Sequence, residues 1–272
     1  GLNEVEDVSL AATINSSAVA NGVTAETGLA ITVGPAGNSQ LSVTGITYGA
    51  NSGADEIAAA INSSASAIGV TARATNTATI SSLDFSGQVA FTLQTTVGGV
   101  ANSNVSIDTT VASTSDLTNL LDAINAQTGT TGISASFSSA AARDSISLTT
   151  ADGRNISIAS VTGAGVNNQG FDLTGTDGLS AALAEGSNPN GIATGGVSLS
   201  SASGAIGLTA ASGPLVTQNS TLSSVNSLLV TSASDAQTAI ETIDAALTQI
   251  SAGRSDLGAI QNRFESVVSS AQ

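Results

Sequence analysis

The sequence contains no histidine, cysteine, methionine, tryptophan or lysine, and its five basic residues are all arginine. Without histidine or cysteine, the chain cannot form a Ser-His-Asp triad, a Cys-His pair or a zinc site of the usual ligand types. It also has no disulfide framework, so packing and hydrogen bonds must hold the fold together. We therefore expect a protein that is not an enzyme and that holds no cofactor.

Positive charge is scarce as well, and the formal net charge is −15 at pH 7. Nucleic-acid binding needs clustered Lys and Arg, and an anionic membrane surface also attracts basic segments, so the composition argues against both partners. No apolar run is long enough to cross a membrane. The first residues lack the basic and apolar regions of a signal peptide. The acidic balance is typical of a soluble protein.

The most regular pattern in the chain is a heptad repeat over residues 234–272. Large apolar residues recur at spacings of three and four, which places them on one face of a helix. They are Ile240, Ile243, Leu247, Ile250, Leu257, Phe264 and Val268. Arg254 and Gln261 interrupt this face, and polar residues at such positions often fix register or partner. At about 1.5 Å per residue, one continuous helix would extend roughly 55 Å, and it would need partner helices to be stable.

This stretch resembles the carboxy-terminal rod helix of bacterial flagellins. The most specific part is the block LGAIQNRF, which runs from Leu257 to Phe264. The resemblance gives Ile260, Gln261, Asn262 and Arg263, together with the apolar face, a role in packing and assembly. The alternative is an ordinary amphipathic helix of a bundle, but a heptad pattern does not by itself specify this block.

The resemblance implies an extracellular structural protein that assembles with other flagellin subunits into the flagellar filament for motility. Flagellins pair this helix with an amino-terminal helical segment and continue beyond it. Both segments are expected to be missing here, so we expect the given chain to be soluble and monomeric by itself.

A second pattern is a phrase that occurs three times, at residues 12–26, 59–73 and 122–137. Each copy contains Ile-Asn, then a glycine, then alternating Val or Ile with Thr or Ser. We predict that each copy is a short helix ending at Asn15, Asn62 or Asn125, followed by a strand. The phrase is similar to the Ile-Asn motif in the outer domains of flagellins and hook-associated proteins.

Short alternating segments elsewhere predict strands and hairpins. The sequence predicts that residues 29–33 pair with 41–43, 89–93 with 105–107, and 146–148 with 156–158 across an Asp-Gly turn. A further short helix is expected within residues 2–14. The predicted fold class is therefore α+β, with β-rich outer domains, short helices on small sheets and one long carboxy-terminal helix. The predicted divisions are outer domains at 1–80 and 81–162, a loop-rich β segment at 163–215, and part of the rod domain at 216–272.

The chain also contains candidate ligands for a metal ion. Two sets of aspartates could supply calcium ligands, but neither has the spacing of a known calcium loop, so no metal site is predicted. The sets are Asp108, Asp116 and Asp122, and Asp172 and Asp177.

The alternative function is a flagellin-like cell-surface protein or adhesin that binds a polysaccharide. This acidic chain would bind an anionic polysaccharide only through a cation bridge or an arginine cluster, for which Arg73, Arg143 and Arg154 are the candidates.

Overall fold

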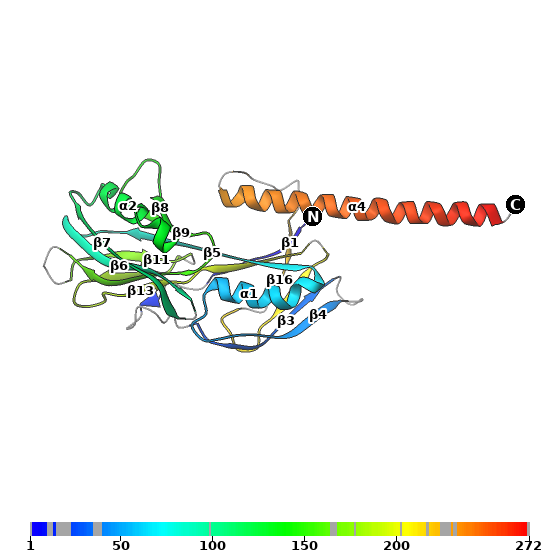
Figure 1. The fold of residues 1–272 in the computed structure, drawn as a ribbon, viewed down its shortest axis with the longest axis horizontal. Coiled ribbons are helices and arrows are strands. Elements are labelled where there is room, and N and C mark those ends of the chain that lie inside the picture. The colour runs from blue at the N-terminus through cyan, green and yellow to red at the C-terminus, as the bar shows by residue number, and fades with distance from the viewer. Residues whose placement is uncertain are drawn as a thin grey trace.

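The fold is α+β and β-rich, as the sequence predicts. The computed structural model describes residues 2–9, 13–14, 23–34, 40–97, 99–163, 168–176, 178–201, 203–215, 218–223, 230 and 233–270. The described strands form three antiparallel sheets, and short helices pack against them. Figure 1 shows these elements as an elongated body from which one long helix projects.

The largest sheet has the strand order β12-β11-β5-β14-β1-β17, and β9 links β8 to β5. Its strands are β1 (Leu2–Ser9), β5 (Val70–Ser81), β8 (Ile133–Phe137), β9 (Ile146–Thr150), β11 (Gly170–Thr174), β12 (Ser180–Ala184), β14 (Gly196–Ser201) and β17 (Thr221–Ser223).

The second sheet has the order β2-β13-β10-β6-β7 and the third has the order β16-β15-β3-β4. The second consists of β2 (Thr13–Ile14), β6 (Gly87–Val97), β7 (Val100–Val111), β10 (Asn155–Thr162) and β13 (Gly191–Ala193). The third consists of β3 (Glu26–Val33), β4 (Leu41–Tyr48), β15 (Ile206–Thr209) and β16 (Gln218–Asn219).

Two hydrophobic cores lie within the body, and we name each after its helix. The α1 core packs helix α1 (Ala54–Ala65) against β3, β4, β5 and β14, with Ile57 and Ile61 fully buried. The α2 core encloses Leu120 and Ile124 of helix α2 (Thr118–Asn125), together with apolar residues of β6, β9, β10 and β11. Strand β5 contributes to both cores, Val70 to the first and Ile80 to the second. This strand is therefore the structural link between them.

The second and third copies of the repeated phrase are structurally equivalent, as predicted. Helix α2 ends at Asn125, as predicted, whereas α1 continues three residues beyond the predicted end at Asn62, so that Asn62 lies in its last turn. Each asparagine bonds both backbone groups of the alanine ten residues later. Asn62 Oδ1 accepts from Ala72 N at 2.7 Å and Nδ2 donates to Ala72 O at 2.8 Å. The matching distances between Asn125 and Ala135 are 2.8 and 2.9 Å.

The glycine of each phrase has the backbone conformation that the connection requires. Gly69 has φ +77° after the 3₁₀-helix η1 (Ser66–Ile68), and Gly132 has φ +72° after helix α3 (Thr128–Thr131). Glycine adopts positive φ at no steric cost, so it suits the reversal from helix to strand. The asparagine bonds then hold the new strand, β5 or β8, beside the helix.

The helix expected within residues 2–14 is wrong for the part that the structure describes. Leu2–Ser9 is strand β1, between β14 and β17, and Thr13–Ile14 is strand β2, beside β13. The apolar spacing of three suggested a helix, but a register shift lies between Val5 and Val8 in β1. These two residues pair with Leu199 and Val197, which are only two apart, so a bulge absorbs the extra residue. Asn15 lies outside the described residues.

Two of the three predicted hairpins are confirmed. Ile31 pairs with Val43 in β3 and β4, and Phe91 pairs with Ile107 in β6 and β7. The third prediction is wrong, because β9 pairs with β5 and β8, whereas β10 pairs with β6 and β13. Both strands carry buried isoleucines of the α2 core. The Asp-Gly turn therefore joins two sheets that face each other across this core.

Candidate assembly surface

The long helix α4 (Ala233–Ser270) has 38 residues and occupies the stretch for which the sequence predicts a helix. Its first part contacts β1, while the rest runs away from the body (Figure 1). Ala239 and Thr242 are buried on this helix, at 7% and 0% exposed. Both are small, so the helix can lie close to the body. The residues that follow them, Ile240 and Ile243, point about 100° further around the helix and are exposed.

The predicted apolar face of α4 is exposed along its whole length. Its large side chains are each between 44% and 64% exposed. They are Ile240, Ile243, Leu247, Ile250, Leu257, Phe264 and Val268, and together with Ile260, which the resemblance adds, they form the set that we call the α4 stripe. Large apolar patches on a soluble protein usually mark an interaction site. The stripe is therefore the candidate assembly surface.

Polar residues interrupt or flank the α4 stripe. Arg254, Gln261, Asn262 and Arg263 are all exposed. Arg254 and Gln261 occupy heptad positions that are otherwise apolar, so they can set the register of a partner helix. Their role in packing stays a prediction.

Sequence reasoning missed one member of this surface. Val267 is 63% exposed and lies beside the stripe, three residues after Phe264 and seven after Ile260. Spacings of four and seven from Ile260 to Phe264 and Val267 are a helical pattern in their own right. A strict heptad assignment places Val268 on the apolar face and therefore leaves out Val267. Ile260, Phe264 and Val267 form this second row. The apolar surface near the end of α4 is therefore wider than one seam.

The three candidate arginines lie on different elements. Arg73 is in β5, opposite Ser198 of β14. Arg154 Nε is 3.0 Å from Asp152 Oδ2 and 3.9 Å from Asp55 Oδ2. Arg143 donates to Thr118 Oγ1 at 3.1 Å, and its guanidinium lies 5.5 Å from the centre of the Phe137 ring. Arg143 and Arg154 are thus held in separate local networks, and a polysaccharide contact at these arginines stays a prediction.

Two of the aspartates that could supply calcium ligands, Asp116 and Asp108, accept local hydrogen bonds. Asp116 accepts hydrogen bonds from the hydroxyl and the backbone N–H of Thr118, which lower its pKa, with a smaller effect from Arg143. Asp108 accepts from Gln88 Nε2 at 2.9 Å, and Asp172 pairs with Ser81 and Ala182 in the sheet. Asp122 is exposed on α2, and Asp177 lies outside the described residues. Within the described ranges, no three Asp, Glu, His or Cys residues group as a metal site would require.

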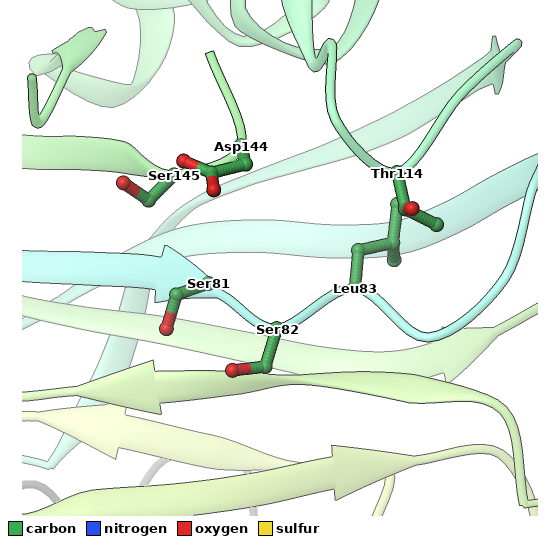
Figure 2. Close-up of a pocket in the computed structure, with 6 residues that line it drawn as sticks. All are labelled: Ser81, Ser82, Leu83, Thr114, Asp144 and Ser145. Carbon is green, nitrogen blue, oxygen red and sulfur yellow. The ribbon is translucent and has the colours of Figure 1, made fainter. Parts of the chain in front are cut away.

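A surface pocket lies where three connecting segments meet (Figure 2). It is lined by Ser81, Ser82, Leu83, Thr114, Asp144 and Ser145. The first three come from the end of β5 and the chain after it, Thr114 follows β7, and Asp144 and Ser145 precede β9. The lining offers one carboxylate, whereas glycoside hydrolysis uses two. This pocket therefore lacks the groups for that reaction.

None of the described helices is both long enough and apolar enough to span a lipid bilayer.

Two comparisons with known proteins bear on this surface. Residues 240–272 match the family described as the bacterial flagellin C-terminal helical region. Over 207 aligned positions the chain is 30% identical to B-type flagellin of Pseudomonas aeruginosa, and the match covers 70% of this chain. It covers 41% of that relative, so the chain spans less than half of the relative's length. The family match begins at the first residue of the α4 stripe.

Proposed function

Because this chain belongs to the bacterial flagellins, we propose that it is a structural subunit of the flagellar filament and serves motility. Its location would be extracellular, in the flagellum at the cell surface. Its partners would be further flagellin subunits, which bind through the α4 stripe. The sheets and short helices of residues 1–215 would then form the outer surface, with domains divided near residues 80 and 162, and residues 216–272 would belong to the rod. The polysaccharide-binding alternative is not favoured.

The observation that carries this proposal is the exposure of the α4 stripe. Fully burying a large apolar side chain stabilises an association by about 1.5–3 kcal/mol. Eight such side chains line one face of a single helix, so packing against helices of neighbouring subunits would bury a large apolar area. A role inside the body is not open to them, because the helix meets the body through Ala239 and Thr242 instead.

Filament growth from purified protein tests the proposal. The protein is produced with any flanking sequence its gene encodes, and polymer is followed by sedimentation and electron microscopy. We expect Phe264→Asp to abolish or strongly slow polymerisation, because it places a charge on the stripe. The matched control is Ser255→Asp, which adds the same charge at an exposed position outside the stripe and should polymerise normally. Normal filaments from Phe264→Asp would overturn the proposal.

A further inference from the structure

Buried polar residues gather where the two hydrophobic cores meet. Asn76, Asn155 and Thr194 are each 0% exposed. Asn76 lies in the middle of β5, between the residues that this strand gives to the α1 core and those it gives to the α2 core. Asn155 begins β10, and Thr194 follows β13. Asp55, in the first turn of α1, is the charged member, with its side chain 19% exposed.

One side-chain oxygen of each of these four residues has no hydrogen-bond donor. Asp55 Oδ1, Asn76 Oδ1, Asn155 Oδ1 and Thr194 Oγ1 are buried and unbonded, four of the five such atoms in the described part of the chain. The amide nitrogens, in contrast, are used. Asn76 Nδ2 donates to Arg154 O at 2.9 Å and to Ala193 O at 2.8 Å, and Asn155 Nδ2 donates to Thr96 Oγ1 at 3.1 Å. These bonds fix the orientation of both amides, so that oxygen is the atom left over.

Backbone pairing and hydrogen bonds make these four residues neighbours. A Cβ placed on Gly53 would press on Asp55 Oδ1 and lie 3.4 Å from Asn155 Oδ1, so both oxygens border the space over this glycine. Ile156 pairs with Ala193 between β10 and β13, which makes Asn155 and Thr194 neighbours across the same strands. The two carbonyls that Asn76 bonds belong to the residues just before Asn155 and Thr194.

The charge of Asp55 is only partly compensated. The capping role at the start of α1 goes to Glu56, whose Oε2 accepts from Gly53 N at 3.0 Å. Arg154 Nε lies 3.9 Å from Asp55 Oδ2, beyond the usual length of a charge-assisted hydrogen bond, and is closer to Asp152. Burial raises the pKa of Asp55, with a smaller opposing effect from its backbone hydrogen bond at Glu56. The Asp55 carboxylate therefore lacks a close positively charged partner.

We propose that Asp55, Asn76, Asn155 and Thr194 form a calcium-binding site at the junction of the two cores. Calcium takes six to eight oxygen ligands and accepts carboxylate, amide, hydroxyl, backbone carbonyl and water oxygens. Hard oxygen donors without nitrogen or sulfur select calcium or magnesium over zinc. Magnesium requires near-octahedral geometry and keeps several of its waters, so calcium suits a mixed set of carboxylate, amide and hydroxyl oxygens better. The bound ion would tie α1 to β10 and β13 and so stiffen the link between the cores.

The affinity should be low, because the site has one carboxylate. Extracellular calcium modules bind at about 10⁻⁴ to 10⁻³ M, and affinity rises with the number of charged ligands. Binding to the folded state alone raises the unfolding temperature by mass action. A weak site of this kind still stabilises the protein at millimolar calcium.

Calorimetric titration and thermal unfolding of the chain in CaCl₂, in MgCl₂ and in EGTA test the proposal. We expect a rise in unfolding temperature with calcium that exceeds the rise with equal magnesium. Asp55→Asn, which keeps the shape but removes the charge, should weaken calcium binding at least about tenfold, a difference that titration resolves readily. Asp108→Asn, the matched control at an exposed carboxylate of β7 away from the site, should leave binding unchanged.

Thr194→Val is the second variant if Asp55→Asn does not fold, because it is isosteric and removes one oxygen ligand; it too should weaken binding. Three results would overturn the site: no calcium-dependent rise, which would mean that water alone fills the space; an equal rise with magnesium; or unchanged binding in the folded variants.

Discussion

At the scale of single residues, the paired asparagines show how a short phrase specifies a tertiary contact. Asn62 and Asn125 each fasten the strand that begins eight residues after them, through both the acceptor and the donor of one amide. Aspartate would lose the donor, and a shorter side chain would lose both bonds. The Ile-Asn pair therefore lies in the last turn of a helix and also anchors the strand that follows.

The first prediction concerns Asn62, which is half-buried, whereas Asn125 is exposed. Asn62→Ala should lower the free energy of unfolding by about 1–3 kcal/mol, because it leaves the backbone groups of Ala72 without partners. The measurement is equilibrium unfolding in urea. Ser63→Ala, the exposed neighbour, serves as control and should stay within about 0.5 kcal/mol of the parent. Equal effects of the two substitutions would refute the anchoring role.

Glu26 is a second residue whose role depends on contacts with residues that are distant in the sequence. It is 1% exposed, and its carboxylate accepts hydrogen bonds from the backbone N–H groups of Thr27, Gly28, Ala211, Ser212 and Gly213. Burial alone would raise the pKa of Glu26, but the bonds from Gly28, Gly213, Ser212 and Ala211 together outweigh it and hold the pKa below its usual value. The carboxylate thus pins the segment after β15 to the start of β3.

This pKa shift leads to the second prediction. A depressed folded-state pKa means that Glu26 contributes its stability above its usual pKa of 4.5, and that this contribution is lost as the pH falls through the lower folded-state pKa. Glu26→Gln should destabilise the protein at neutral pH and make stability less dependent on pH in the acid range. Urea unfolding at neutral pH and at acid pH measures both effects. Asp108→Asn, at an exposed carboxylate, should change neither, and an unaltered acid dependence in Glu26→Gln would contradict the account.

Residue roles of this kind are only partly readable from the sequence. The recurrence of Ile-Asn marks Asn62 and Asn125 as related, and the glycine seven residues later marks the reversal. Glu26 gives no such signal, because its partners at 211–213 lie far along the chain. Asn76, Asn155 and Thr194 also give no signal in the sequence, because they become neighbours only when β5, β10 and β13 are in register.

At the scale of elements, local pattern predicts best where the partner is also local. The hairpins β3-β4 and β6-β7 connect neighbouring strands, so alternation and a turn signal were sufficient. The segment 146–158 has the same signals, but its two strands enter different sheets. The apolar spacing of three in strand β1 favours a helix, but in the structure this spacing reflects a bulge. Both errors arise from long-range pairing that overrides local preference.

The third prediction concerns α4, whose distal half has few tertiary contacts to support it. Gly258 lies in this half, and a Cβ there would meet nothing within 4 Å. Gly258→Ala should therefore stabilise the helix by about 1 kcal/mol, the difference in helix propensity. Amide hydrogen exchange around residue 258 should slow relative to the parent, while exchange in β5 stays the same as an internal control. Faster exchange at 258 would show that the helix is not formed as described.

At the scale of the whole molecule, the chain combines a body whose apolar side chains are buried in two cores with a helix whose apolar face is exposed. Each core is closed by its own short helix, and the α4 stripe stays outside both. A net charge of −15 disperses single molecules, whereas the stripe favours association through one defined surface. The sequence predicted this contrast, because the heptad over residues 234–272 differs so clearly from the alternating strands before it.

The absence of cysteine from the sequence allows the central claim to be measured directly. A single Leu257→Cys substitution places a thiol on the α4 stripe, and a single Ser106→Cys substitution places one on the exposed side of β7. Both thiols should react rapidly with a water-soluble maleimide in the monomer. In the assembled filament, we predict that the thiol at 257 becomes protected and the thiol at 106 stays reactive. Equal reactivity of the two thiols in the filament would contradict assembly through the α4 stripe.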